Sequence, residues 1–252
     1  KQDKYAISQE ALRPWFPYDK VLDGMFGVAS RLFDVSFEEV SDFDTWHPDV
    51  RLFHVLSNDS ANSGEKIATF YLDVYAREHK RGGAWMADCK VRRRTSTGEL
   101  QLPVAFLTCN FNGPVDGKPA LLTHNEVTTL FHEFGHGLHH MLTQVEESAV
   151  SGINGVAWDA VELPSQFMEN WCWENDAIPM MSGHYETGEA LPDDMLEKML
   201  AAKNFQSAMQ MVRQLEFSLF DFSIHCYYPQ HQTDNVSIHQ VLDNIREQVA
   251  VI

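Results

Sequence analysis

The chain has 252 residues, enough for a domain with its own hydrophobic core, and 44% apolar with 22% charged residues is an ordinary globular balance. Its formal net charge of −17 argues against nucleic acid as a partner, because phosphate binding needs clustered Lys and Arg. The sequence contains no run of 18 or more apolar residues, so we predict no membrane-spanning helix.

The first half of the chain predicts one helix and a small sheet. Apolar residues recur at helical spacing over residues 19–33. Three strand-like stretches follow at 50–57, 66–77 and 102–111, with the turn-rich segment NDSANSGE between the first two. The one basic run, KVRRR at 90–94, is typical of the solvated end of a hairpin. We therefore expect a small sheet within residues 50–111.

The second half predicts helices. The segment THNE has the pattern of a capping box, so we expect a helix from Thr123 to about Leu142. Another helix is predicted for 163–175, with Pro164 in its first turn. Further helices fit three segments: 192–202, 204–227 and one that starts near Val236. The predicted fold class is mainly α with one small β-sheet, and we expect residues 1–252 to be a single fragment in which 123–252 form the helical part.

The ends of the sequence suggest a fragment of a longer protein. The first residue is Lys1, and the last residues, VLDNIREQVAVI, stop inside an amphipathic helical pattern. The cysteines are scattered and form no C-x-x-C pair, unlike a disulfide scaffold. We therefore expect a cytoplasmic protein whose cysteines are reduced thiols. These four cysteines are Cys89, Cys109, Cys172 and Cys226.

The segment LFHEFGHGLHH, at 130–140, contains the pattern H-E-x-x-H. Residues i and i+4 of a helix lie on the same face, so His132 and His136 can bind one metal ion. Glu133 follows the first histidine, where its carboxylate can reach a water on the metal without being a ligand. We predict one Zn²⁺ per chain, because imidazole and carboxylate ligands favour that ion.

His140 offers a rival pairing with His136. The three histidines of this face cannot share one tetrahedral ion, because His132 and His140 are two turns, about 11 Å, apart along the helix axis. Only the first pair has a glutamate in the base position; the second pair has Gly137 there. We therefore predict that His140 does not bind the metal, and that it has a structural role or contacts one of the ligand side chains. We predict that His139 faces away from the metal.

A catalytic zinc needs a third protein ligand and an open position. Glu162 and Glu169 share one face of the next predicted helix and are the main candidates, and Asp159 is a third. The glycine-rich segment 152–157 lets the chain turn back, so that this helix packs beside the first. Four flanking aromatic residues predict that the helix is largely buried: Trp158, Phe167, Trp171 and Trp173.

Two further groups of residues carry weaker signals. His184 and Tyr185, in SGHYETG, are candidates for contact with substrate or with the side chains that orient the metal ligands. The alternative is that they form a polar turn at the end of a helix. A run of methionines and phenylalanines at 209–222 is more typical of core than of a cofactor site: Met209, Met211, Phe217, Phe220 and Phe222.

The segments TLFHEFGHGLHHML, GVAWDAVELPSQFMENWCWE and SGHYETGEALP together resemble the thimet oligopeptidase family of zinc metallopeptidases. The resemblance covers essentially the whole chain. It implies a zincin-type, helix-rich catalytic region in which His132, His136 and Glu162 bind zinc and Glu133 is the general base. It also implies a longer protein, with helical parts before and after this region and a His- and Tyr-containing segment in the later part that holds substrate and stabilises the oxyanion.

The family resemblance implies a zinc endopeptidase that cleaves short peptides and, when full length, is a monomer. A sister branch removes dipeptides from C-termini, but GVAWDAVELPSQ looks more like the endo-acting branch. Two alternatives stay open at this point: a dipeptidyl carboxypeptidase, and a zinc-binding fragment that is catalytically incomplete.

Overall fold

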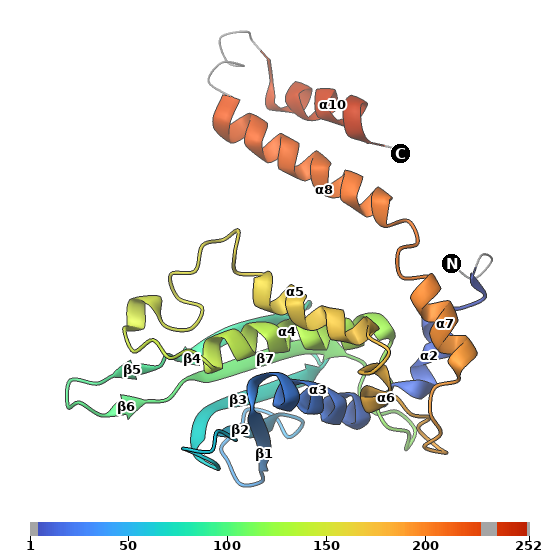
Figure 1. Cartoon of the computed structure of the whole chain (residues 1–252). Coiled ribbons are helices and arrows are strands. Elements are labelled where there is room, and N and C mark those ends of the chain that lie inside the picture. Colours follow the sequence, from blue (N-terminus) through green and yellow to red (C-terminus); the bar gives the residue numbers. More distant parts are fainter. Residues whose placement is uncertain (1–4, 228–235, 251–252) are drawn as a thin grey trace. The chain divides into compact units, whose positions relative to one another are not determined.

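The computed structural model describes residues 5–227 and 236–250 (Figure 1). The chain divides into two compact units. The larger unit contains residues 6–197, and the smaller begins at Lys198 and includes Tyr5. Within the described ranges, no helix is both long enough and apolar enough to cross a membrane.

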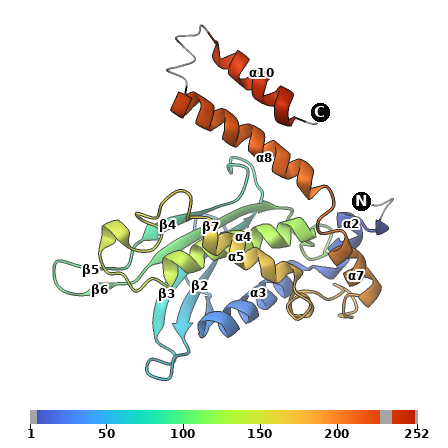
Figure 2. The same ribbon diagram turned by 45° about the horizontal axis from the view of Figure 1, so that its top comes forward.

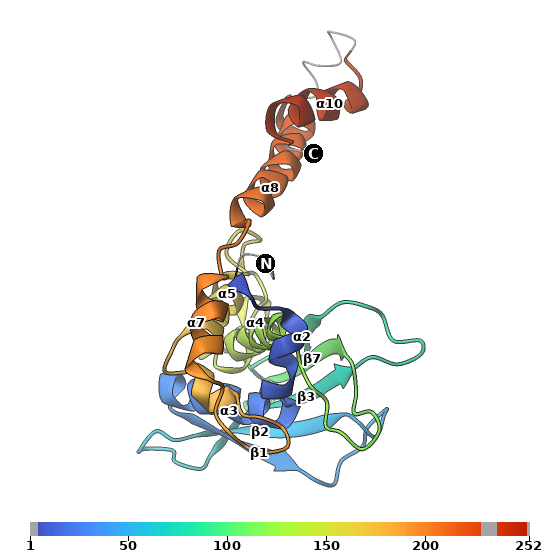
Figure 3. The same cartoon turned by 90° about the vertical axis from the view of Figure 1, so that its right-hand side faces the viewer.

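The larger unit contains a five-stranded mixed sheet in the order β1-β2-β3-β7-β4. Figure 3 shows β1, β2, β3 and β7 following one another across it. The strands β3 and β7 are parallel, and the other neighbours are antiparallel. A separate hairpin, β5 (Arg93–Arg94) with β6 (Leu100–Gln101), carries the basic run. The sheet strands are β1 (Val35–Val40), β2 (Arg51–Ser57), β3 (Lys66–Tyr75), β4 (Trp85–Lys90) and β7 (Val104–Phe111).

The three predicted strands are present as β2, β3 and β7, but the sheet extends beyond them at both edges. The prediction missed β1 and β4 because neither has a clear apolar pattern. Each is an edge strand with acidic or polar residues and mostly half-exposed or exposed side chains. Edge strands are paired on one side only, so their sequences need less apolar surface than central strands do.

The helices α3 (Tyr18–Phe33) and α4 (His124–Met141) pack on the sheet through a cluster of phenylalanines. Phe26 of α3 lies 5.1 Å from Phe53 of β2 and 5.9 Å from Phe134 of α4, measured between ring centroids. Phe70 of β3 lies 5.9 Å from Phe134 as well. This shared aromatic core fixes α4 on the sheet.

The helix α5 (Leu163–Glu169) lies along α4 (Figures 1 and 2) and continues as the 3₁₀ turn η3 (Asn170–Trp173). The prediction that this helix is largely buried was wrong, since most of its residues are exposed or half-buried, and the flanking Trp158 is 93% and Phe167 44% exposed. The inward side is made instead by smaller residues, Ser165, Met168 and Cys172. Short elements complete the unit: α2 (Gln9–Leu12), η1 (Arg13–Trp15), η2 (Ser148–Val150) and α6 (Ile178–Met181).

The helix α7 (Asp193–Ala201) leads into the smaller unit. There α8 (Ser207–Phe222), the π-helical turn η4 (Ser223–Tyr227) and α10 (Ile238–Val249) follow, and Arg246 pairs with Glu216 at 2.8 Å. The prediction of a core for the methionines and phenylalanines of α8 was wrong, because α8 has no buried residue. Within this unit α8 packs mainly on α10.

A buried carboxylate holds the segment between β3 and β4. Asp73 accepts hydrogen bonds from both terminal nitrogens of Arg77 at 2.7 Å and from Lys80 Nζ at 2.8 Å. The indole N–H of Trp46 donates to it at 3.0 Å. Burial alone would raise the pKa of Asp73, but these hydrogen bonds outweigh it and hold the pKa at about 2.

The low pKa of Asp73 predicts a specific loss of stability in acid. A group whose pKa falls on folding from 3.8 to about 2 stabilises the fold above pH 4, and this contribution is lost as the pH falls from about 4 towards 2. Asp73→Asn should remove that part of the acid transition and cost about 3 kcal/mol at neutral pH, because it leaves the buried Lys80 without its counter-ion. Urea unfolding followed against pH would measure both effects. The exposed neighbour Glu78 is the control: an equal loss in Glu78→Gln would contradict the assignment.

Candidate metal centre

The motif helix α4 begins where its capping box predicts. Thr123 Oγ1 accepts from the Glu126 N–H at 3.2 Å, and the Glu126 carboxylate accepts from the Thr123 N–H at 2.7 Å. The predicted helix is therefore confirmed, and His132 and His136 lie one turn apart on it. Their rings are in edge-to-face contact, with centroids 4.9 Å apart.

Glu162 meets both histidines. Its Oε2 atom lies 3.1 Å from His132 Nε2 and 3.1 Å from His136 Nε2. Among the described residues, these three side chains form a group in which one possible ligand atom from each lies within 4.8 Å of the others. The structure thus brings together the three residues that the sequence motif and the family resemblance selected.

A close helix contact at Gly135 brings Glu162 to the histidines. A Cβ atom at this position would lie 2.6 Å from the Pro164 carbonyl oxygen and 2.6 Å from Ser165 Cα. Only a glycine lets the first turn of α5 lie so near α4. Gly152 and Gly155, with φ of +64° and +71°, reverse the chain between the two helices.

Ser165 orients Glu162, a role that the sequence interpretation missed. The Ser165 hydroxyl is fully buried and lies 2.8 Å from the Glu162 carbonyl oxygen and 2.9 Å from its Oε2. A serine three residues after a helix-entrance glutamate is the signal that was available, because this spacing lets the hydroxyl reach back one turn.

Glu169 lies behind the histidines. Its Oε1 atom is 2.6 Å from His132 Nδ1, so this nitrogen donates to the carboxylate and the Nε2 lone pair is left for a metal. Burial lowers the pKa of His136, and the negative charge of Glu162 offsets this only in part. Burial thus favours neutral His136, and the hydrogen bond to Glu169 leaves Nε2 of His132 free; a neutral histidine with a free nitrogen is the form that binds metals.

Glu133 is buried beside the three ligands and is not one of them. Its carboxylate accepts a hydrogen bond from the backbone N–H of Met86 on β4. Burial raises the pKa of Glu133, and the negative charge of Glu162 adds to the rise, while His132 opposes it. A carboxylate that shares a cleft with the ligands and is held by the edge strand has the position that a general base needs.

A cleft of about 600 Å³ opens onto these groups. Its polar groups are His132, Glu133, His136, Glu162 and Asn154, whereas most other lining side chains are apolar. These apolar lining residues come from β4, from the residue before it and from the loop before α5: Ala84, Trp85, Met86, Ile153, Val156, Trp158 and Val161.

The donor set fits zinc. Two imidazole nitrogens and one carboxylate oxygen are a ligand set of catalytic zinc sites, in which the fourth position is open to water or substrate. The cleft supplies that access, and Glu169 supplies the carboxylate that such histidines usually have behind them.

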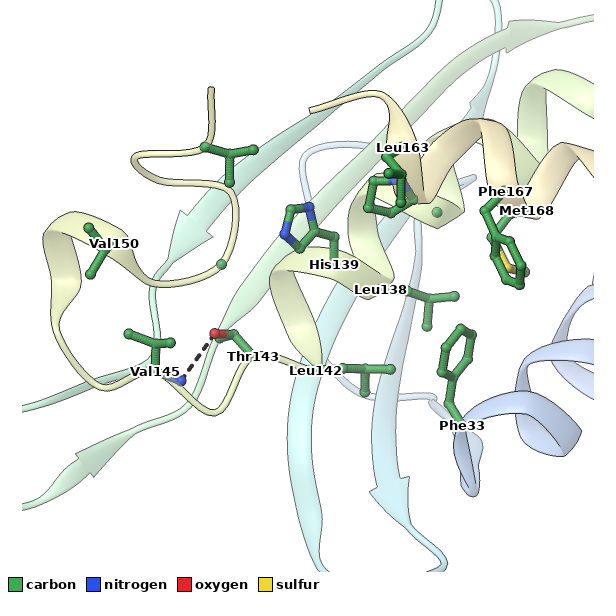
Figure 4. A pocket seen from close by; sticks show the side chains of 14 residues that line it. Phe33, Leu138, His139, Leu142, Thr143, Val145, Val150, Leu163, Phe167 and Met168 are labelled. Atoms are coloured by element: carbon green, nitrogen blue, oxygen red, sulfur yellow. Dashed lines mark hydrogen bonds between the residues drawn. The ribbon is translucent and has the colours of Figure 1, made fainter. Parts of the chain in front are cut away.

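Two other histidines of α4, His139 and His140, do not join the three proposed ligands. His140 is fully buried, with Nε2 2.9 Å from the Lys90 carbonyl oxygen. His139 lines a separate apolar pocket of about 530 Å³ between α4, α5 and the loop that carries Val145 and Val150 (Figure 4). The expected difference between these two neighbours is therefore present in the structure.

His184 and Tyr185 do not line the cleft. The His184 ring packs on Trp15, with centroids 4.9 Å apart, and the Tyr185 hydroxyl donates to Glu186 at 2.8 Å. A contact of these two residues with substrate stays a prediction. The four cysteines are free, with Cys109 and Cys172 buried and Cys89 and Cys226 exposed.

Comparison with known proteins identifies the family. The whole chain, residues 1–252, matches Peptidase family M3. This chain belongs to that family. It is 58% identical over 252 residues to Oligopeptidase A of Salmonella typhimurium, and this match covers all of the chain and 36% of the relative. The resemblance to a family of oligopeptidases, seen in the sequence motifs, is thereby confirmed.

Two more distant relatives show the breadth of the family. The chain is 46% identical over 233 residues to the organellar oligopeptidase A of Arabidopsis thaliana, covering 90% of the chain and 29% of the relative. It is 38% identical over 226 residues to the dipeptidyl carboxypeptidase of Salmonella typhimurium, covering 89% and 32%. The chain thus spans about a third of the length of these M3 relatives.

The contact at Gly135 predicts that one added methyl group disturbs the centre. In Gly135→Ala the Cβ meets backbone atoms that cannot rotate away, so α5 must move, at a cost of about 1–3 kcal/mol. Glu162 moves with α5, and we expect zinc to bind at least about tenfold more weakly, as happens when ligand geometry is disturbed. Zinc titration and thermal unfolding would measure the two effects.

Gly137→Ala is the matched control on the same helix. Its Cβ would meet Leu107 Cδ2 at 3.0 Å, the end of a side chain that can shift. We expect a smaller loss of stability and unchanged zinc affinity. Equal zinc affinity in both alanine variants would contradict the role given to Gly135.

The carboxylate behind His132 predicts a graded effect on metal affinity. Glu169→Ala should weaken zinc binding by about 10–100-fold, because His132 loses the acceptor that fixes its tautomer and ring orientation. Glu169→Gln keeps an acceptor oxygen and should lose less. Competition with a chromogenic chelator would measure the affinities, and the exposed Glu174→Ala serves as control. Unchanged affinity in Glu169→Ala would show that the hydrogen bond has no such role.

Proposed function

We propose that this protein is a zinc-dependent endopeptidase that hydrolyses internal bonds of short peptides. One observation carries the proposal: two histidine Nε2 atoms and a Glu162 oxygen converge beside Glu133, in a chain of peptidase family M3. We propose His132, His136 and Glu162 as ligands of one zinc ion per chain and Glu133 as the catalytic base.

A bound zinc would polarise the scissile carbonyl and lower the pKa of the attacking water. The Glu133 carboxylate takes a proton from that water and delivers it to the leaving amine. Met86, through its backbone N–H, and the burial of the side chain hold this carboxylate in place. Glu169 keeps His132 in the tautomer that leaves Nε2 free.

Residues 1–252 are proposed to be part of one catalytic domain of the zincin type. The motif helix α4 packs on a mixed sheet whose edge strand β4 contacts the motif glutamate, and the third ligand comes from the following helix. These features support the proposal. The resemblance to the family further implies that groups beyond residue 252 stabilise the oxyanion.

The comparisons favour an oligopeptidase over the two alternatives. Identity is 58% to an oligopeptidase A and 38% to a dipeptidyl carboxypeptidase, and the donor set is complete in the described residues. We propose short peptides as the partners, with no role for nucleic acid or membrane, and a monomeric full-length protein. A cytoplasmic location is proposed as well, supported by 45% identity to a relative named probable cytosolic oligopeptidase A of Arabidopsis thaliana.

The roles of Glu133 and His132 predict opposite effects on zinc. Glu133→Gln should lower kcat by at least about a hundredfold, as expected for loss of a general base, while one zinc stays bound. His132→Ala should lose the zinc itself. Metal analysis and cleavage of a quenched internal peptide would be measured on the longest natural polypeptide that contains this chain, with His139→Ala as control. Stoichiometric zinc in His132→Ala, or zinc loss in Glu133→Gln, would contradict these assignments.

The reaction class is tested by substrates with blocked ends. An endopeptidase cleaves a peptide whose N- and C-termini are both blocked, and a chelator stops the cleavage until zinc is restored. Cleavage that requires a free C-terminus would point to the dipeptidyl carboxypeptidase instead. One bound zinc with no cleavage of any peptide would favour the non-catalytic alternative.

A further inference from the structure

His140 joins two elements that line the metal cleft. It lies one turn after His136 on α4, and its side chain has no exposed surface. Its Nε2 atom is 2.9 Å from the carbonyl oxygen of Lys90, the last residue of β4. Because a carbonyl oxygen only accepts, Nε2 carries the proton, and His140 ties the end of the edge strand to the motif helix.

The other side of the same ring supports the loop before α5. A Cβ atom at Gly152 would lie 2.3 Å from His140 Nδ1 and 3.0 Å from Cε1, so the backbone of the loop lies directly against the imidazole. The φ of +64° at Gly152 is also one that glycine adopts without strain. Nδ1 is buried and has no hydrogen-bond partner among the residues that the structure describes, so this side of the ring acts as a packing surface for the loop.

The two tied elements form walls of the cleft. The strand β4 contributes Trp85 and Met86, and the loop contributes Ile153 and Val156. Neither element carries one of the proposed metal ligands; two of these lie on α4, and Glu162 is the N-cap residue of α5. The walls therefore depend on a different contact from the ligands.

We infer that His140 is a positioning residue that holds the strand β4 and the loop 151–156 in place and so sets the width of the cleft that receives a peptide. The inference rests on the proposed function, because that function assigns the cleft to a peptide. It predicts that loss of the imidazole weakens substrate binding more than it slows the chemical step. Contacts between the cleft walls and the peptide stabilise the bound substrate and the transition state equally. Their loss therefore raises KM and leaves kcat nearly unchanged.

Three substitutions separate the two contacts. His140→Leu removes both the tie to Lys90 and the flat surface under Gly152. His140→Gln keeps an N–H donor for the Lys90 carbonyl and loses the ring. Gly152→Ala keeps the tie and pushes the loop off the ring, because its Cβ overlaps Nδ1. His139→Gln is the matched control, since this neighbouring histidine lines the apolar pocket of Figure 4 and, within the described ranges, its Nδ1 has no hydrogen-bond partner.

Hydrogen exchange tests the mechanical part without any need for activity. We expect faster exchange at 86–90 and at 151–156 in His140→Leu, but only at 151–156 in His140→Gln and Gly152→Ala. His139→Gln should match the unchanged protein. If His140→Leu does not fold, the other two variants decide: faster exchange of both segments in His140→Gln, or of neither, would overturn the inference.

Kinetics test the functional part in the longest natural polypeptide that contains this chain. His140→Leu should raise KM for a quenched internal peptide about tenfold, with kcat within about twofold and one zinc retained, as expected when substrate-positioning contacts are lost. His140→Gln should recover part of the KM. Equal KM in the Leu and Gln variants, or zinc loss together with the rise in KM, would overturn the inference. Failure of the proposed function would look different, because the unchanged protein would then show no zinc-dependent cleavage. The hydrogen-exchange pattern of the variants would still test the contacts of His140 with Lys90 and Gly152.

Discussion

The close contact between α4 and α5 at Gly135 is the constraint on which the metal centre depends. Backbone atoms of Pro164 and Ser165 lie only 2.6 Å from the position of an added Cβ, so the start of α5 touches the backbone of α4 at this point. The third ligand precedes this contact by two residues in the sequence and therefore lies within reach of both histidines. Any side chain at position 135 would push Glu162 away from the two histidines. A zinc site tolerates very little displacement of its ligands.

The rest of the larger unit holds this helix pair in a fixed place. The phenylalanine cluster at Phe26, Phe70 and Phe134 sets α4 on the sheet, and the sheet places its edge strand β4 along the motif. Two of the three proposed ligands then have a partner of their own. Glu169 holds His132, and Ser165 holds Glu162, so these two donors are oriented before any ion binds.

Exposed apolar surface is concentrated where the sequence suggested core. Trp158 and Leu163 are 93% and 70% exposed, and the apolar residues of α8 have no buried member. Helical periodicity and aromatic content report that a segment has apolar surface, but not which element covers it. The same limit explains β1 and β4, since half-exposed edge strands carry little periodic signal.

The sequence by itself determined the motif helix, its capped start and the pairing of His132 with His136, because these follow from local spacing along one helix. It narrowed the third ligand to Glu162, Glu169 or Asp159, and the family resemblance favoured the first. Only the tertiary structure assigned the two carboxylates to different atoms, Glu162 to both Nε2 atoms and Glu169 to Nδ1 of His132. The tertiary structure also showed that His140 contacts Lys90 and Gly152 and is not paired with His136 as a metal ligand. These contacts join residues that are 50 and 12 positions away from it in the sequence. Such contacts are set by packing between elements, and local sequence patterns carry no information about them.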